Sequence, residues 1–171
     1  MKPNLEEIPE FYQPYVNALP DEDIIDLLGR LGSEMVKVLE GLSSSESEFR
    51  YENGKWSIKE LLLHIIDAER VFSYRALRFS RGDKTDLPGF DQDDYVKNCM
   101  ISNRNLPELI DEFKNVRASS ISLYASFDDS QLGLTGTGNG FEFSVNAICY
   151  ITAGHQAHHL KILKERYLKL S

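Results

Sequence analysis

Histidine is the residue type in this sequence best suited to metal chemistry, and three of its four histidines occupy positions 155, 158 and 159. Residues four apart lie on the same side of a helix, so His155 and His159 project together, along the apolar face of their segment. His64 lies in a second apolar segment, at the edge of the buried face. Three imidazoles in an apolar groove are costly unless each nitrogen finds a partner. One divalent transition metal ion held by His64, His155 and His159 would partner all three.

The acidic residues near these histidines do not fit two other kinds of metal site. Metalloproteases of the H-E-x-x-H type use the glutamate as general base, and Gln156 takes its place here. Di-iron bundles need two E-x-x-H pairs and further carboxylates, whereas Glu60 and His64 are spaced by four and stand alone. A single ion held by three histidines fits better. The alternative is a metal-free bundle whose histidines are structural.

Four further side chains are candidates for supporting roles around the site. Glu60 and Asp67 could each orient a ligand imidazole by accepting its N–H, although a helix cap and a solvated surface position explain them as well. His158 could be an alternate ligand, a surface residue or a neighbour of the ligands in a pocket, and we favour the last. Arg75 lies on the His64 side and could contact an anionic group of a substrate or form a surface ion pair.

The segments that must position these residues have the periodicity of helices. The first begins after Pro20, with Asp21 as the expected N-cap, and ends near Leu42. The second begins at the S-x-x-E capping box of Ser57 and Glu60, and glycine 82 stops it.

Two more helices are expected at about 106–127 and 144–168. The segments 83–104 and 128–143, after the second and third helices, exceed the usual helix–helix loop length, so they are candidates for pocket walls or partner contacts. A short N-terminal helix or arm is expected at 6–18. No part of the sequence indicates a substantial sheet, so the pattern predicts an all-α four-helix bundle.

The composition indicates one domain spanning residues 1–171, with 42% hydrophobic residues to build its core. The net charge of −8, from 27 acidic and 19 basic residues, disfavours nucleic acid as a partner. No apolar run is long enough to cross a membrane, and the N-terminus has the pattern of neither a signal nor a transit peptide. We therefore expect a cytoplasmic protein with no membrane partner. Cys99 and Cys149 suggest no disulfide framework.

Two motifs together resemble the DinB/YfiT-like family of metalloenzymes. The first is KWSIKE at residues 55–60, followed by His64, Asp67 and Glu69. The second is GHQAHH at residues 154–159. Their separation spans most of the chain, from the second helix to the last.

The resemblance implies a four-helix bundle with an unusual crossing, often a homodimer, that holds one nickel, zinc or similar ion. In the family one ligand comes from the second helix and two, spaced by four, come from the last. These correspond here to His64, His155 and His159.

The family includes bacillithiol S-transferases and, more distantly, mycothiol-dependent maleylpyruvate isomerase. The resemblance therefore implies a small-molecule substrate and makes a low-molecular-weight thiol a candidate cosubstrate. A bound ion lowers the pKa of water or of a thiol, which suits a metal-dependent hydrolase or a thiol S-transferase. The alternative is a noncatalytic metal-binding or interaction module, in which the ion stabilises the bundle or a homodimer.

Overall fold

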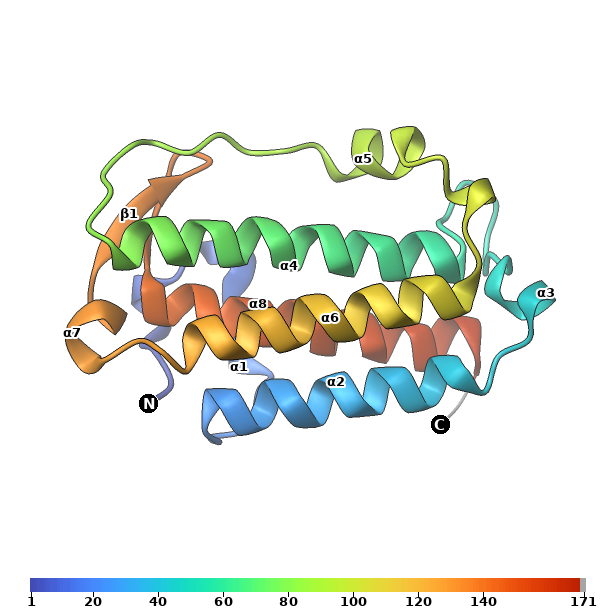
Figure 1. Ribbon diagram of the computed structural model, residues 1–171, viewed down its shortest axis with the longest axis horizontal. Coiled ribbons are helices and arrows are strands. Elements are labelled where there is room, and N and C mark those ends of the chain that lie inside the picture. Colours follow the sequence, from blue (N-terminus) through green and yellow to red (C-terminus); the bar gives the residue numbers. More distant parts are fainter. Residues whose placement is uncertain (170–171) are drawn as a thin grey trace.

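Four long helices form the body of the protein (Figure 1). The computed structural model describes residues 1–169. Within them, α4 packs against both α6 and α8, and α2 closes the bundle against the same two helices. The expected all-α four-helix bundle is confirmed. The helices are α2 (Ile24–Glu40), α4 (Ile58–Ser80), α6 (Leu106–Tyr124) and α8 (Val145–Ile162), the last continuing into a π-helical turn (Leu163–Tyr167).

The directions of the helices explain the longer connection. The colour change along each ribbon shows that α4 and α6 run one way, and α2 and α8 run the other (Figure 1). Because α4 and α6 are consecutive long helices that run in parallel, the chain must return along the whole bundle, a distance of about 34 Å at about 1.5 Å per residue. Segment 83–104 makes this return beside α4, and it contains α5 (Gln92–Asn98) and a 3-10 turn (Ile101–Asn103).

The helices begin where side chains accept hydrogen bonds from free backbone N–H groups. The expected capping box of α4 is present: Ser57 Oγ accepts from Glu60 N at 3.3 Å, and the Glu60 carboxylate accepts from Ser57 N at 2.6 Å. Asp21 was the wrong choice for α2. The N-cap is Asp23, whose Oδ1 accepts from Ile25 N at 2.8 Å, because it is the aspartate that directly precedes the first helical residue.

The connection between α6 and α8 contains a small hairpin. A short helix, α7 (Asp129–Leu132), leads to β1 (Thr135–Gly138), which pairs antiparallel with β2 (Phe141–Ser144). The turn residues Asn139 and Gly140 have φ of 55° and 76°, the positive values that a two-residue type I′ turn requires. The hairpin is a local addition to the all-α bundle.

The two long connections meet at this hairpin. Leu87, near the start of segment 83–104, donates from its backbone N to Thr137 O at 3.0 Å, and its carbonyl oxygen accepts from Asn139 N at 2.8 Å. The first connection is thereby fixed over the C-terminal end of α4.

The N-terminal segment packs along α8. It forms two 3-10 turns (Leu5–Glu7 and Glu10–Tyr12) and the short helix α1 (Gln13–Asn17), so the helix expected in this region is present. Its close approach requires Gly154, because a Cβ there would lie 2.7 Å from the carbonyl oxygen of Tyr15. A further short helix, α3 (Ser44–Ser47), follows α2.

A layer of polar side chains divides the apolar core into two clusters. One cluster includes Phe72 and Phe79 from the second half of α4, and the other includes Ile65 and Leu160. On α8, His155 and Gln156 of this polar layer lie between the residues that belong to the first apolar cluster and those that belong to the second. The buried members of the layer are each at most 7% exposed: His64, Glu69, Arg117, His155 and Gln156.

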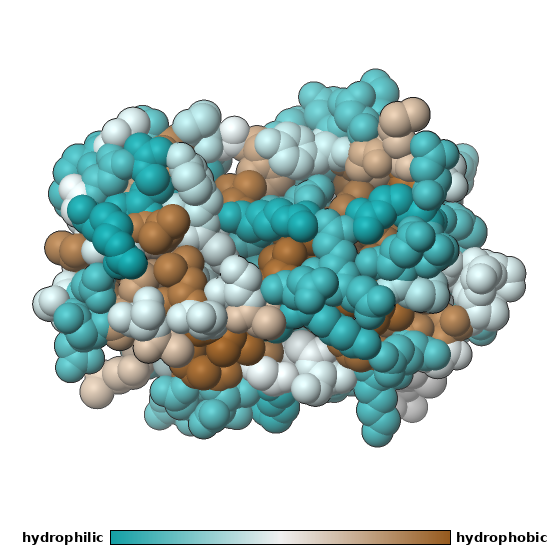
Figure 2. Space-filling model, viewed as in Figure 1, coloured by the Kyte–Doolittle hydropathy of each residue, from teal (hydrophilic) through white to brown (hydrophobic). Residues whose placement is uncertain are grey.

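The outer surface shown in Figure 2 is mainly hydrophilic, with separate hydrophobic patches between the polar side chains. Among residues 1–169, no helix has both the length and the apolar content needed to span a membrane.

Candidate metal centre

Three imidazoles from two helices converge inside the bundle. α4 contributes His64, and α8 contributes His155 and His159, which lie one turn apart on one face. Nε2 of His155 lies 3.0 Å from Nε2 of His64 and 3.1 Å from Nε2 of His159. Taking one ligand atom from each residue, all three atoms lie within 4.8 Å of one another. The fold therefore brings together the three residues that the sequence singles out.

A metal ion fits these contacts better than hydrogen bonds do. An imidazole nitrogen carries either one proton or one lone pair, so Nε2 of His155 can make only one of its two short contacts as a well-directed hydrogen bond. Nδ1 of His159 is buried without a hydrogen-bond partner among the described residues, and its Nε2 is the nitrogen that faces the other imidazoles. A cation accepts several lone pairs at once, and ligand nitrogens about 2.1 Å from one ion lie roughly 3 Å apart. The two separations from Nε2 of His155, 3.0 Å and 3.1 Å, match that spacing.

Burial keeps the three imidazoles neutral at pH 7. It lowers the pKa of His64 from 6.5 to about 4 and the pKa of His159 to about 3, with neighbouring imidazoles adding to the effect at His159. Burial, reinforced by the other histidines, also lowers the pKa of His155 well below its ordinary value. Neutral imidazole is the form that binds a metal, so the site is in its binding-competent protonation state at neutral pH.

Aromatic rings surround the imidazoles. The ring of Trp56 lies tilted over His64, with 4.7 Å between centroids. The edges of Phe72 and Tyr15 contact His155 at centroid distances of 5.7 Å and 6.1 Å. These rings hold the imidazoles in place and exclude water from two sides of the site.

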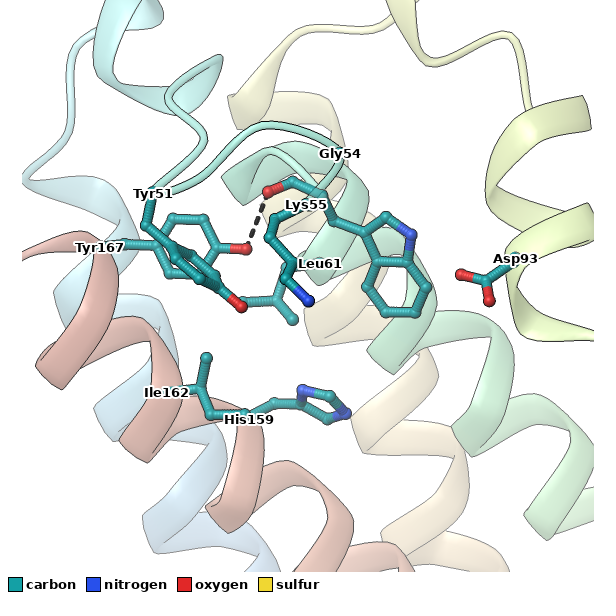
Figure 3. A pocket seen from close by; sticks show the side chains of 9 residues that line it. Tyr51, Gly54, Lys55, Leu61, Asp93, His159, Ile162 and Tyr167 are labelled. Carbon is teal, nitrogen blue, oxygen red and sulfur yellow. Dashed lines mark hydrogen bonds between the residues drawn. The ribbon is translucent and has the colours of Figure 1, made fainter.

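A cavity of about 360 Å³ opens beside His159 (Figure 3). The hydroxyl of Tyr167 donates to the carbonyl oxygen of Trp56 at 2.8 Å, which ties the end of α8 to the loop before α4 and fixes two walls of the cavity. Since His64 and His155 are buried, His159 is the histidine that borders this space. The other lining side chains combine rings, charges and aliphatic groups: Tyr51, Lys55, Trp56, Leu61, Asp93, Ile162 and Tyr167.

The two acidic candidates do not reach the imidazoles. The Glu60 carboxylate accepts hydrogen bonds from Ser57 N and from Arg50, so it serves the helix cap. Asp67 lies 3.6 Å from Arg70, and burial raises the pKa of its carboxyl group. Within residues 1–169, neither carboxylate hydrogen-bonds with an imidazole. Glu60 therefore has the helix-cap role that the sequence offers as its alternative, whereas Asp67 is partly buried beside Arg70 and is not a solvated surface residue.

His158 borders the site, whereas Arg75 lies away from it. The ring of His158 packs against Tyr15 and His159, with centroid distances of 4.7 Å and 5.2 Å, and it is not one of the converging ligands. Arg75 lies on the His64 side of α4, but about three turns, or roughly 16 Å, further along the axis. Helical spacing therefore correctly places His64 and Arg75 on the same side of α4. Their distance along the helix axis nevertheless keeps Arg75 away from the metal centre.

Sequence reasoning does not single out Tyr15, Asp93 or Tyr167. Tyr15 had one available signal, because a glycine such as Gly154 inside a helical pattern often marks the close approach of another backbone. Asp93 had none, since its place depends on the path of segment 83–104 across the bundle.

The chain belongs to the DinB superfamily, whose family model matches residues 27–163. YfiT from Bacillus subtilis, described as a "probable metal-dependent hydrolase with an unusual four-helix bundle topology", superposes with a TM-score of 0.74 at 13% identity, covering 100% of this chain and 95% of that one. A mycothiol-dependent maleylpyruvate isomerase superposes with a TM-score of 0.69 at 13% identity, covering 85% of this chain and 61% of that one. At such identity the two structures establish the fold alone. No curated protein sequence matches the chain.

Proposed function

We propose that this chain is a metal-dependent enzyme that binds one divalent transition metal ion, nickel or zinc, through Nε2 of His64, His155 and His159. The observation that carries the proposal is the convergence of three neutral imidazole nitrogens whose mutual contacts cannot all be hydrogen bonds. Imidazole is a preferred ligand of both metals. Three protein ligands leave coordination positions for other molecules, and His159 borders a cavity large enough for a small substrate.

The bound ion supplies one kind of chemistry: it lowers the pKa of a coordinated water or thiol, so that a nucleophile is available near neutral pH. The cavity lining within the described residues includes no serine, threonine or cysteine, and we take the nucleophile to come from solvent or from a small thiol. Lys55 and Asp93 offer a cation and a carboxylate to polar groups of the substrate. The rings of Tyr51 and Trp56 offer contact with its apolar part.

Two reaction types fit this arrangement, a hydrolase and a thiol S-transferase. The fold neighbours support this choice, since one is described as a probable metal-dependent hydrolase and the other as mycothiol-dependent. In the transferase case a low-molecular-weight thiol is the cosubstrate. The homodimer that the family resemblance implies stays a prediction.

A noncatalytic metal-binding module is the second candidate. His64 and His155 are only 4% and 7% exposed, which suits an ion that ties α4 to α8 and stabilises the bundle. In this case the coordination sphere is closed to small molecules.

Metal analysis of protein purified without a His tag tests the site. We expect one transition metal ion per chain, and none in a His155→Ala variant. His158→Ala is the matched control: its ring lies beside the site but outside the converging atoms, so it keeps one ion. Full metal content in a variant with His64, His155 and His159 all changed to alanine would refute the assignment.

Cobalt substitution separates the candidate functions. If a thiol such as cysteine or bacillithiol reaches the ion, a sulfur-to-cobalt charge-transfer band appears, as the transferase requires. A spectrum that responds to small anions such as azide but not to thiols supports the hydrolase. A spectrum insensitive to both indicates a closed site and contradicts the proposal of an enzyme.

A further inference from the structure

Arg75 is a buried cation without a counter-ion. The residue is only 4% exposed. Among residues 1–169 its side chain makes one hydrogen bond, in which Nη2 donates to the carbonyl oxygen of Pro88 at 2.9 Å. None of the ion pairs in this part of the chain includes it. Burial lowers the pKa of its guanidinium, the direction expected of a cation removed from water.

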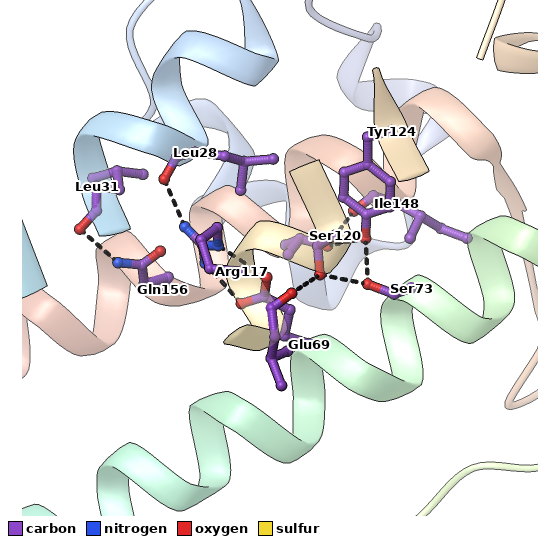
Figure 4. Close-up of polar contacts among 11 residues, drawn as sticks. Leu28, Leu31, Glu69, Ser73, Arg117, Ser120, Tyr124, Ile148 and Gln156 are labelled. Atoms are coloured by element: carbon purple, nitrogen blue, oxygen red, sulfur yellow. Dashed lines mark hydrogen bonds and ion pairs between the residues drawn. The ribbon is translucent and has the colours of Figure 1, made fainter. Parts of the chain in front are cut away.

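Arg117 shows what an equally buried arginine looks like when the protein supplies its partners (Figure 4). It is 5% exposed, and its Nε and Nη2 donate to the two carboxylate oxygens of Glu69 at 2.9 Å and 2.7 Å. Its Nη1 donates to the carbonyl oxygen of Leu28 at 2.8 Å. All three nitrogens of Arg117 are therefore used, whereas Arg75 uses one.

Arg75 lines a cavity of about 510 Å³ between α4 and segment 83–104. Two other arginines line it, but Arg70 pairs with Glu112 and Arg78 pairs with Asp83. The carboxylate of Asp86 is also in the lining, although it is exposed and forms no ion pair with Arg75. Most of the remaining wall is aromatic or aliphatic: Val71, Tyr74, Leu87, Phe90 and Tyr95.

The surroundings hold the guanidinium in a fixed position. Leu87 is hydrogen-bonded to the hairpin, which anchors the wall that carries Pro88. Gly138 of β1 packs directly on the arginine, since a Cβ at this position would lie 3.0 Å from Nε of Arg75. Phe90 and Tyr95 pack against each other with 5.0 Å between ring centroids. The cavity is thus built before any ligand enters.

We propose that this cavity is a second ligand site, which binds a small organic carboxylate through Arg75 and packs its aromatic or aliphatic body against Phe90 and Tyr95. A buried charge is costly unless it is paired, and the guanidinium fork matches a carboxylate with two parallel hydrogen bonds. The apolar wall selects an organic anion over inorganic phosphate. The volume lies within the range of small-molecule sites. The site lies about three turns along α4 from His64 and does not depend on the proposed function.

Binding of 2-naphthoate, followed by calorimetry and by two-dimensional amide NMR, tests this site. We expect saturable binding, with shifts at the amides of residues 74–75 and 87–95. The same affinity is expected with the metal loaded and with it chelated, because a carboxylate bound at the metal centre would lose its site on chelation. The neutral analogue 2-naphthamide should bind at least tenfold more weakly, since it lacks the charge that pairs with Arg75.

Arg75→Gln should weaken 2-naphthoate binding at least tenfold. The matched control is Arg70→Gln, which changes an ion-paired arginine of the same cavity and should alter the affinity less than threefold. Absence of binding to the wild type, equal binding of the amide, or shifts confined to the surroundings of His159 would each overturn the proposal. These three outcomes are all measured on the wild-type protein, so the proposal can be tested even if Arg75→Gln does not fold.

Discussion

Two buried polar clusters lie in the middle of the bundle, and they differ in whether the protein satisfies them. In the first, Arg117 donates two hydrogen bonds to the Glu69 carboxylate, and its third nitrogen donates to a backbone carbonyl oxygen (Figure 4). In the second, His64, His155 and His159 place three nitrogens close together without enough protons to bond them all. A polar cluster whose groups are all hydrogen-bonded to one another holds the helices together. A cluster with an unpaired nitrogen can instead bind a ligand such as a metal ion.

A row of hydroxyl groups next to the ion pair extends the satisfied cluster. Ser73 lies 2.9 Å from Ser120 and 3.2 Å from Tyr124, and Tyr124 lies 3.1 Å from Thr152. The row ends on a backbone carbonyl, because Thr152 donates to Ile148 O at 2.9 Å. Burial raises the pKa of Tyr124, so its hydroxyl stays protonated and each oxygen in the row has a partner.

The largest expected effect comes from breaking the satisfied cluster. Glu69→Gln removes the negative charge and leaves Arg117 buried and unpaired, so we expect the free energy of unfolding to fall by roughly 3–5 kcal/mol. Urea denaturation measures this loss. Metal content per folded chain should not change, because Glu69 does not contact the histidines.

A double variant sharpens this result. Glu69→Leu with Arg117→Met removes both charges and keeps the volume similar, so it should recover most of the stability lost in the single variant. If Glu69→Gln cost less than about 1 kcal/mol, the pair would not be the structural element inferred here.

The histidine site could be predicted from the sequence because its signal is local. The i, i+4 spacing of His155 and His159 fixes their common face, and the apolar stripe around them points that face inward. His64 is predicted in the same way from its own helix. The sequence leaves the roles of Glu60 and Arg75 open, because a helical pattern gives only the angle of a residue around the helix axis. It does not give the hydrogen-bond partner or the distance along the bundle.

The fold was predictable to a similar depth. Caps and periodicity place the four helices. The Asn139-Gly140 pair is the usual signal of a two-residue hairpin turn, but the strands on either side have four residues each, too few for a pattern that predicts them. The parallel course of α4 and α6 could not be derived, because the length of segment 83–104 is compatible with several paths. The length of segment 83–104 makes it a candidate pocket wall, and it lines both cavities through Asp93 and Phe90. Which of its residues face each cavity follows from the path and could not be predicted.

Acidifying the metal-free protein should have a smaller effect for each titrating group. Burial lowers the pKa of His64 to about 4 and that of His159 to about 3, while an unfolded histidine titrates at about 6.5. Below pH 6.5 the unfolded chain therefore binds more protons than the folded chain, so stability falls as the pH falls. Between pH 7 and pH 5 we expect a loss on the order of 2 kcal/mol per histidine, measured by urea denaturation in the presence of a chelator.

A variant carrying His64→Gln and His159→Gln should weaken this dependence, since glutamine does not titrate, and the part that remains comes from His155, whose pKa burial also lowers. Glu69→Gln, which leaves both histidines in place, should keep the slope of the wild type from a lower starting stability. An unchanged slope in the double histidine variant would show that other groups cause the acid sensitivity.

The smallest expected effect comes from Tyr124→Phe, which tests whether the hydroxyl row is independent of the histidine site. Tyr124→Phe removes one hydroxyl from the row, and Thr152 keeps its backbone acceptor at Ile148, so only the links through Tyr124 are lost. We expect a loss of about 1 kcal/mol in urea denaturation, with one metal ion per chain retained. Tyr95→Phe, whose ring is 47% exposed, is the control and should change stability very little. If Tyr124→Phe instead removed the metal, the hydroxyl row would have to support the histidines, and the two clusters would be one functional unit.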